Sequence, residues 1–232
     1  MTKIYCDIAD INLIKKFNKK KIVKGFTTNP SLMRKAGAKN YKKYSKAILA
    51  KTNKPVSLEV FADNPKDMIA QGNEISMWGK NVYVKVPVTN SKGQFMGSVI
   101  SDLNKNAIKL NITAVYTANQ TKKILDKINN KTKVIISIFA GRMADVGKDP
   151  IPEIKKSILI SKKYRNVEIL WASTREPYNY LQAKQLKCHI ITAPPSIIEK
   201  IEKFGNTFAE LTKNTVKGFL TCLLYTSDAA DE

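Results

Sequence analysis

The sequence has few of the residues that build disulfide frameworks, metal sites and catalytic triads. Its 232 residues include three cysteines, Cys6, Cys188 and Cys222, and a single histidine, His189. Three widely separated cysteines match neither a disulfide-stabilised domain nor the paired spacing of zinc ligands. One histidine argues against a histidine-based metal site or triad. We therefore predict a protein that uses no metal and no cofactor, and a structural role for His189.

Long apolar runs are also missing. No stretch of about 18 apolar residues occurs, and the N-terminal segment MTKIYCDIAD lacks the charged-then-apolar pattern of a signal peptide. We expect a cytoplasmic protein without a membrane partner. A hydrophobic fraction of 43% is enough to form one sizeable core at this length.

Arginine is scarce although the chain is strongly basic. The formal net charge is +21, but the arginines among the forty basic residues are only Arg34, Arg142, Arg165 and Arg175. The lysines are spread along every segment, as in proteins from AT-rich genomes. Clustered cations attract nucleic acid, but neither a recognition motif nor alternating aromatic and basic residues accompany the charge. We predict no nucleic-acid partner.

The last eleven residues, 222–232, break the composition of the chain. They contain no lysine, asparagine or isoleucine, and one back-translation of CLLYTSDAADE resembles a transposon-type sequencing adapter read in frame. We expect the native reading to end near Thr221. The predicted organisation is a single domain over residues 1–221 followed by a foreign tail.

Eight short apolar, β-branched runs alternate with polar stretches of helical character. They span residues 3–9, 22–29, 56–62, 82–88, 110–117, 133–140, 167–173 and 188–194. Strands that alternate with helices form parallel sheets, and a closed barrel of this type has eight strands. The fold class is therefore α/β, and we predict a single (β/α)8 barrel, the TIM-barrel architecture. Within residues 27–32, a Thr or Asn cap before Pro30 predicts the start of a helix.

Successive residues of a strand point to opposite faces, so each run has a less apolar face. In four runs this face carries polar residues: Asp7 in the first, Glu59 in the third, Lys85 in the fourth, and Asn111 with Thr113 in the fifth. The same alternation adds Phe61 to the face of Glu59 and Val115 to that of Thr113. We expect this face to line the barrel interior, near the end where barrel enzymes have their active sites. Trp171, on the seventh run, is expected in the core.

A lysine enclosed among apolar strands is a candidate nucleophile. Loss of hydration favours its neutral amine, which attacks carbonyl carbons to form a Schiff base. That chemistry needs neighbouring acid and base groups, and Asp7 and Glu59 are of the right type. The alternatives are that Lys85 extends its amine to water at a sheet edge, and that each carboxylate only forms a structural ion pair.

Six segments resemble, in order, the signature segments of the transaldolase family. They are GFTTNPSL (25–32), VSLEVFA (56–62), VYVKVPVT (82–89), LNITAVYT (110–117), ISIFAGRMAD (136–145) and ILWASTREP (169–177). The resemblance covers about residues 3–220 and extends to the short subfamily that contains fructose-6-phosphate aldolase. It implies that Lys85 is the Schiff-base lysine, that Asp7 is the acid/base for carbon–carbon cleavage, and that Glu59 works through a water held with Thr113.

The resemblance also implies residues that bind substrate. Asn29, Asn111 and Ser137 correspond to groups that bind a dihydroxyacetone unit, with Thr28 and Phe139 beside them, while Arg142, Ser173 and Arg175 match phosphate-binding residues. The planar donor fork of a guanidinium suits phosphate. Sugar phosphates are the expected substrates, and a homo-oligomer is expected from the short members of the family.

Two positions distinguish transfer of the three-carbon unit from its hydrolysis. In the aldolase subgroup a glutamine usually replaces the carboxylate of the third strand, and a tyrosine stands in place of Phe139. Glu59 and Phe139 follow the transferase pattern, because an apolar ring offers no hydroxyl to direct water at the intermediate.

We therefore predict a transaldolase of the pentose phosphate pathway. It is expected to transfer a dihydroxyacetone unit from fructose 6-phosphate or sedoheptulose 7-phosphate to an aldose phosphate. The alternatives are a fructose-6-phosphate aldolase-like lyase and a catalytically inactive basic binding protein on the same barrel.

Overall fold

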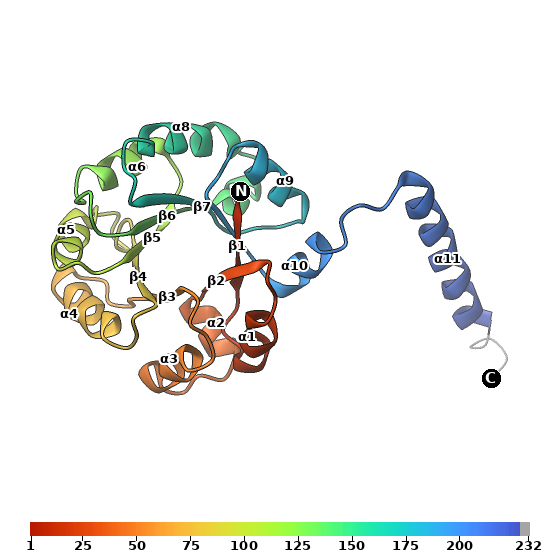
Figure 1. Ribbon diagram of the computed structural model, residues 1–232, viewed down its shortest axis with the longest axis horizontal. Helices are drawn as coiled ribbons and strands as arrows, with labels where there is room; N and C mark the ends of the chain where they lie inside the picture. The colour runs from red at the N-terminus through yellow and green to blue at the C-terminus, as the bar shows by residue number, and fades with distance from the viewer. Residues whose placement is uncertain (228–232) are drawn as a thin grey trace. The chain divides into compact units, whose positions relative to one another are not determined.

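Eight parallel strands close into a barrel in the computed structural model of the chain (Figure 1). The structure describes residues 1–227, and for residues 222–227 it describes the backbone alone. The strands are β1 Lys3–Asp7, β2 Val23–Thr27, β3 Val56–Glu59, β4 Val82–Pro87, β5 Leu110–Val115, β6 Val134–Ile138, β7 Val167–Trp171 and β8 Ile190–Ala193. Each pairs with its neighbours in sequence, and β1 closes the ring by pairing with β8. The predicted (β/α)8 barrel is confirmed.

Helices alternate with the strands and surround the ring (Figure 1). They are α1 Ile11–Asn18, α2 Pro30–Lys35, α3 Tyr41–Leu49, α4 Pro65–Ser76, α5 Gly97–Lys105, α6 Ala118–Leu125, α7 Ala140–Ala144, α8 Ile151–Ser161 and α9 Tyr178–Gln185, and α10 Pro195–Ile201 follows β8. The start of α2 is as predicted: Oδ1 of Asn29 accepts the N–H of Leu32 at 2.9 Å, with Pro30 in the first turn. None of the helices in the described part of the chain has the length and apolarity needed to cross a membrane.

The chain divides into two compact units, Met1–Ile198 and Glu199–Glu232. The first contains all eight strands. The second contains α11 Phe208–Ser227, which begins with reciprocal capping: Oγ1 of Thr207 accepts the N–H of Glu210 at 3.2 Å, and the Glu210 carboxylate accepts the N–H of Thr207 at 2.7 Å. The single domain over residues 1–221 and the foreign tail stay predictions, and residues 228–232 of that tail lie outside the described residues.

The third strand is shorter than predicted. It ends at Glu59, and Phe61 is 62% exposed, so Phe61 does not share the barrel interior with Glu59. Beyond this point, side chains of α3 and α4 bond the backbone on the side of β2: Tyr41 contacts Glu59, and Gln71 accepts the N–H groups of Phe61 and Ala62.

The fifth strand loses its regular alternation near its end. Ala114 has a φ of 57°, and the pairing with β6 shifts between Ile112 and Val115. Val115 pairs with Ile138, which like Ile112 belongs to the outer face. This bulge corrects the prediction that Val115 continues the inward row of Thr113.

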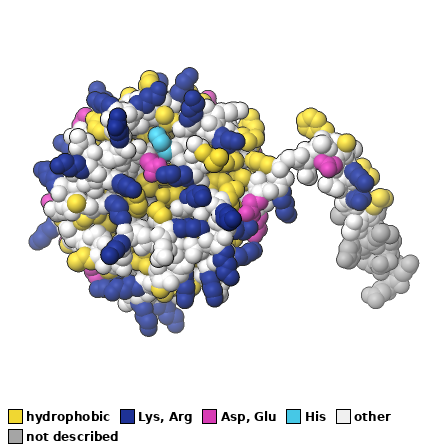
Figure 2. Space-filling view, viewed as in Figure 1, with side chains coloured by type: hydrophobic (Ala, Val, Ile, Leu, Met, Phe, Trp, Pro, Cys, Tyr) yellow, Lys and Arg dark blue, Asp and Glu magenta, His cyan; other side chains and the backbone are white. Residues whose placement is uncertain are grey.

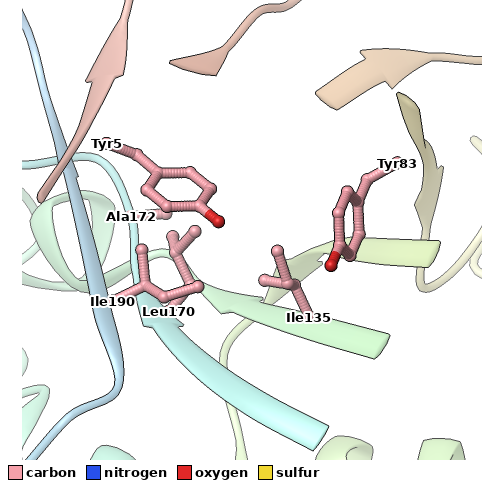
Figure 3. Packing of buried hydrophobic residues seen from close by; sticks show 6 residues of the cluster. All are labelled: Tyr5, Tyr83, Ile135, Leu170, Ala172 and Ile190. Carbon is pink, nitrogen blue, oxygen red and sulfur yellow. The ribbon is translucent and has the colours of Figure 1, made fainter. Parts of the chain in front are cut away.

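Large side chains fill the barrel toward the amino ends of the strands. Tyr5, Tyr83, Ile135, Leu170, Ala172 and Ile190 form a buried cluster, against which Phe139 packs (Figure 3). Gly25 makes room for this filling, because a Cβ there would lie 2.6 Å from the ring of Tyr5. The interior is therefore packed at one end, and polar side chains occupy the other.

Trp171 was predicted to lie in the core and His189 to have a structural role, and the contacts of both agree with this. Trp171 is 2% exposed. His189, just before β8, accepts the N–H of Ile169 on Nδ1 at 3.0 Å, and burial lowers its imidazole pKa.

The positive charge is dispersed over the surface. Figure 2 shows Lys and Arg side chains around the whole outline of the barrel unit and across the visible face, with few Asp or Glu among them. Ion pairs such as Lys42 with Glu74, at 2.8 Å, join exposed side chains and add little stability. This distribution matches lysines that solvate helix faces.

Candidate active site

A cavity of about 290 Å³ opens at the carboxyl ends of the strands. Ten of the twelve predicted site residues line it: Asp7, Asn29, Lys85, Asn111, Thr113, Ser137, Phe139, Arg142, Ser173 and Arg175. The lining is completed by Thr27, Ala172, Thr174, Thr192 and Pro194. The other two predicted residues, Thr28 and Glu59, lie behind the lining and contact Lys85.

A larger recess, about 750 Å³, lies at the amino ends of the strands. Its charged lining residues are Lys80, Lys109, Lys131 and Lys133, and its lining contains no carboxylate. Without an acid or base beside a nucleophile this recess is not equipped for covalent chemistry. The smaller cavity is therefore the candidate active site.

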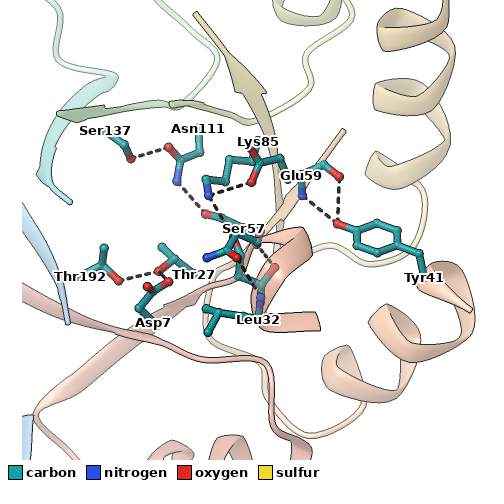
Figure 4. A network of polar contacts seen from close by, with 12 residues as sticks. Asp7, Thr27, Leu32, Tyr41, Ser57, Glu59, Lys85, Asn111, Ser137 and Thr192 are labelled. Carbon is teal, nitrogen blue, oxygen red and sulfur yellow. Dashed lines mark hydrogen bonds and ion pairs between the residues drawn. The ribbon is translucent and has the colours of Figure 1, made fainter. Parts of the chain in front are cut away.

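Lys85 on β4 lies directly beside Glu59 on β3. The two residues are register partners, and Nζ of Lys85 lies 3.0 Å from Oε2 of Glu59 (Figure 4). The same Nζ donates to the carbonyl oxygen of Thr28 at 3.1 Å, while the buried Thr28 hydroxyl donates to the carbonyl of Ser57. Lys85 is 7% exposed and belongs to a closed barrel. It is thus not an edge lysine with its amine in solvent.

Asp7 ends β1 and faces the same cavity. The hydroxyl of Thr27 donates to Oδ1 of Asp7 at 2.7 Å and lies 2.5 Å from the hydroxyl of Thr192 (Figure 4). Burial raises the pKa of the Asp7 carboxyl above its ordinary value, and the charge of Lys85 and the Thr27 hydrogen bond oppose the shift. A carboxyl that holds its proton more tightly is suited to exchange one with a substrate hydroxyl.

A chain of neutral polar groups forms the next part of the wall. Oγ of Ser137 donates to Oδ1 of Asn111 at 2.6 Å, and Nδ2 of Asn111 donates to Oγ of Ser57 at 2.9 Å (Figure 4). Thr113 is buried, and its hydroxyl has no hydrogen-bond partner in the protein. A buried hydroxyl left open at a cavity wall can bind a ligand or water.

Arg175 forms a bidentate ion pair with Asp145 at the mouth of the cavity. Its Nε donates to Oδ1 at 2.9 Å, and a terminal nitrogen contacts Oδ2. Arg175 holds the pKa of the Asp145 carboxyl below its usual range. The guanidinium of Arg142 lies 5.7 Å from the centre of the Phe139 ring. The two arginines thus place positive charge on the side of the cavity formed by the β6 and β7 ends.

Helix α7, which follows β6, and the loop after β7 meet at an unusually close contact. Ser173 has a φ of 63°, and a Cβ on Gly141 would lie only 1.6 Å from the Ser173 carbonyl oxygen. Only glycine allows the two backbones to approach in this way. Arg142 directly follows Gly141, and Arg175 lies two residues after Ser173. The contact therefore brings both arginines to the same cavity.

Several side chains that contact site residues have no role that was predicted from the sequence. Thr27 and Ser57 lie on inward faces of predicted strands, so strict alternation identifies them as interior. Asp145 is the last residue of the segment 136–145, but periodicity does not show which residue a loop side chain contacts. Tyr41 lies on a helix, and no sequence signal connects it with Glu59.

The chemistry available is that of an amine, two carboxyl groups, hydroxyls, carboxamides and guanidiniums. Among the residues that the structure describes, no three His, Cys, Asp or Glu side chains are grouped to hold a metal ion. A nucleophilic amine between carboxyl groups, with cations on one side, fits a carbonyl compound that carries an anionic group.

Solved structures of other proteins share the fold. Inosine 5' monophosphate dehydrogenase from Legionella pneumophila superposes with a TM-score of 0.58 at 10% identity, over 84% of this chain and 58% of that chain. At this identity the likeness shows the fold alone.

Sequence relatives are more specific. Residues 4–224 match the family model described as Transaldolase/Fructose-6-phosphate aldolase. The chain is 32% identical over 212 residues to a "Probable transaldolase" from Thermoanaerobacter sp. (strain X514), covering 91% of this chain and 94% of the relative. It is 34% identical over 220 residues to a "Probable transaldolase" from Nitrosopumilus maritimus (strain SCM1), covering 94% and 93%. The chain belongs to the transaldolase/fructose-6-phosphate aldolase family.

Proposed function

We propose that this protein is a transaldolase that moves a dihydroxyacetone unit between sugar phosphates through a Schiff base on Lys85. The observation that carries the proposal is one buried lysine amine in a cavity that also receives Asp7, with Glu59 in direct contact at 3.0 Å. The family and the relatives support the reaction class.

The first half-reaction breaks a carbon–carbon bond of the donor. The Lys85 amine adds to the ketone carbon of a ketose phosphate, and the adduct loses water to give an iminium ion. Asp7 accepts the proton of the C4 hydroxyl while the C3–C4 bond breaks. The bonding electrons pass to the iminium nitrogen, which leaves an enamine on Lys85 and releases an aldose phosphate.

The second half-reaction reverses these steps with a new aldehyde. The enamine carbon attacks the carbonyl carbon of an acceptor aldose phosphate, and Asp7 returns its proton to the oxygen that becomes a hydroxyl. Water then adds to the iminium ion and releases the ketose phosphate. In this proposal Glu59 exchanges protons with that water, and the hydroxyl of Thr113 helps to hold it.

The remaining lining residues bind the two ends of the sugar. Asn29, Asn111 and Ser137 offer hydrogen bonds to the three-carbon unit. Arg142 and Arg175, with Ser173, offer charge-assisted hydrogen bonds to phosphate. Phe139 contributes an apolar ring, which supports transfer rather than hydrolysis of the enamine.

Reductive trapping tests the proposal. Incubation with fructose 6-phosphate and borohydride should attach a reduced three-carbon group to Lys85, located by peptide mass analysis. Lys85→Met should abolish both adduct and turnover while leaving the fold intact, because a thioether cannot form an imine. Lys109→Met, in the recess at the opposite end of the barrel, is the matched control and should react as the wild type does.

Two results would contradict the proposal. An adduct on a different lysine, or turnover by Lys85→Met, would remove the Schiff base from Lys85. Release of free dihydroxyacetone at the rate of transfer to erythrose 4-phosphate would make aldolase the better description.

A further inference from the structure

The carboxyl end of β3 has lost its neighbour on one side. β2 pairs with β3 through Phe26 with Val56 and Thr27 with Ser57, and β2 then leaves the sheet toward α2. On the other side β3 stays paired with β4, because the N–H of Val60 donates to the carbonyl of Lys85 at 3.0 Å. Peptide groups alternate in direction along a strand, so those of Glu59 point to the side that β2 has left.

The hydroxyl of Tyr41, the first residue of α3, takes the place of the missing strand. It accepts the N–H of Glu59 at 2.9 Å and donates to the carbonyl oxygen of Glu59 at 2.9 Å (Figure 4). A single hydroxyl can do both because it has one proton and two lone pairs. Burial raises the pKa of the Tyr41 phenol far above its ordinary value, which keeps the donated proton in place.

Tyr41 is itself held by aromatic contacts. Its ring meets Phe61 edge-on at a centroid distance of 5.4 Å and lies 5.8 Å from Trp78. The next two peptide N–H groups after Val60, those of Phe61 and Ala62, both donate to Oε1 of Gln71, at 2.9 and 3.0 Å. Side chains, and not a strand, therefore fix the backbone from Glu59 onward on this side.

We propose that Tyr41 is a positioning residue that holds the Glu59 carboxylate against Lys85. The proposal rests on the proposed function, in which Lys85 forms the imine. The Glu59 side chain reaches Nζ of Lys85 from a backbone position whose N–H and C=O groups bond to Tyr41 on the β2 side. A displacement of about 1 Å in such a contact is enough to slow a reaction about 100-fold.

The proposal predicts which steps slow down. Formation and hydrolysis of the imine require proton transfer to and from water, and this transfer is the proposed role of Glu59. Carbon–carbon cleavage depends on Asp7, which accepts the hydroxyl of Thr27 on β2, and that hydroxyl in turn contacts Thr192 on β8. Loss of the Tyr41 hydroxyl should therefore slow imine formation and leave substrate affinity nearly unchanged.

The experiment compares two tyrosines of the same helix. Tyr41→Phe keeps the ring and removes the hydroxyl from Glu59. Tyr44→Phe removes a hydroxyl that donates to the carbonyls of Ala9 and Ala36, at 3.1 and 3.2 Å, away from Glu59. With fructose 6-phosphate, Tyr41→Phe should lower the single-turnover rate of imine trapping about tenfold or more with KM within twofold, and Tyr44→Phe should leave both within twofold.

A double substitution separates positioning from general stability. In a Glu59→Gln background the carboxylate that Tyr41 positions is gone, so Tyr41→Phe should cause less than a twofold further loss. An equal loss in both backgrounds would overturn the proposal, as would a wild-type trapping rate in Tyr41→Phe itself. If the wild-type protein forms no adduct on Lys85, the result contradicts the proposed function. It does not bear on the contact between Tyr41 and Glu59.

A fluorinated tyrosine keeps the test open if Tyr41→Phe does not fold. 3,5-Difluorotyrosine at position 41 retains ring and hydroxyl, but its phenol ionises at lower pH than that of tyrosine. The ionised oxygen cannot donate to the Glu59 carbonyl. Its trapping rate should match the wild type at neutral pH and fall as its phenol ionises, which phenolate absorbance follows; a trapping rate that stays constant through this ionisation would overturn the proposal.

Discussion

Glu59 and Lys85 are register partners on β3 and β4, and their side chains meet at 3.0 Å inside the barrel. Paired residues of parallel strands point to the same face, so register brings the carboxylate and the amine to the same side of the sheet. Because β2 does not pair with Glu59, the hydroxyl of Tyr41 bonds the end of β3 from which Glu59 reaches Lys85.

Substitution of Glu59 should affect chemistry more than binding. Glu59→Gln keeps the shape of the side chain and removes its charge, and it should lower kcat for transfer by about 100-fold, a typical effect of losing one acid/base group. Glu168→Gln is the control, because that carboxylate pairs with Lys3 at 2.7 Å at the other end of the barrel. Steady-state kinetics with fructose 6-phosphate and erythrose 4-phosphate give kcat for both variants. Unchanged kcat in Glu59→Gln would assign the carboxylate a structural role only.

The raised pKa of Asp7 implies a stability term with a definite dependence on pH. The folded protein binds this proton more tightly than the unfolded chain does. The contribution to the free energy of unfolding is therefore fully present below the ordinary Asp pKa, about 3.9, and is lost as pH rises through the higher folded pKa. Asp7→Asn carries no charge to bury, so its melting temperature relative to the wild type should rise from pH 4 to pH 8.

Asp10→Asn is the control for that measurement. Asp10 caps α1 by accepting the N–H of Leu13 at 2.8 Å, and asparagine caps equally well. A difference between wild type and Asp7→Asn that is flat with pH would show that Asp7 is not the titrating group.

Removal of either cavity arginine should weaken binding of phosphorylated sugars. A hydrogen bond to a charged group is worth about 1.5–3 kcal/mol, and partial exposure of Arg175 favours the lower end, so KM should rise about tenfold for Arg142→Ala and Arg175→Ala. Arg175→Ala also leaves the Asp145 carboxylate unpaired near the phosphate, so adding Asp145→Asn should recover part of the loss. Arg165→Ala, outside the cavity, should leave KM unchanged. Equal use of unphosphorylated fructose by the wild type would refute the phosphate assignment.

A methyl group at Gly25 should destabilise the barrel. The added Cβ would lie 2.6 Å from the ring of Tyr5, which other members of the buried cluster confine. Overpacking of this kind costs about 1–3 kcal/mol, which in a chain of this size lowers the melting temperature by several degrees. In Gly218→Ala the new Cβ meets no atom within 4 Å, so the barrel transition should not move. An unchanged melting temperature in Gly25→Ala would show that the ring of Tyr5 is free to shift.

The barrel and the polar interior residues of four strands could be predicted because they follow from periodicity. Apolar alternation identified eight strands, and sheet register then placed Asp7, Lys85, Asn111 and Thr113 together. The other predicted lining residues were implied by the family resemblance and do not follow from periodicity. Predictions were wrong where a strand stops obeying that period. Phe61 lies beyond the end of β3, and Val115 follows the bulge at Ala114.

Contacts made by helices and loops could not be predicted in this way. The ion pair between Asp145 and Arg175 depends on how α7 and the loop after β7 meet at Gly141. The bonds from Tyr41 to Glu59 depend on where β2 ends and on the direction in which α3 begins. Each of these contacts joins two segments that are distant in the sequence, so no local sequence pattern predicts it.

Phe139 is the residue on which the choice between transfer and hydrolysis depends most. Its ring packs against the buried cluster, lies 6.0 Å from the ring of Tyr116 and lines the cavity that contains Lys85. Transfer requires the enamine to wait for an aldehyde, and an apolar ring cannot orient water toward it.

Phe139→Tyr should therefore lower transfer to erythrose 4-phosphate and raise release of free dihydroxyacetone from fructose 6-phosphate without acceptor. Stability should fall by about 1–3 kcal/mol if the new hydroxyl finds no partner. Phe208→Tyr, on an exposed ring that is not part of the cavity lining, is the control and should alter neither rate. If Phe139→Tyr releases dihydroxyacetone no faster than the wild type, exclusion of water by this ring is not what favours transfer.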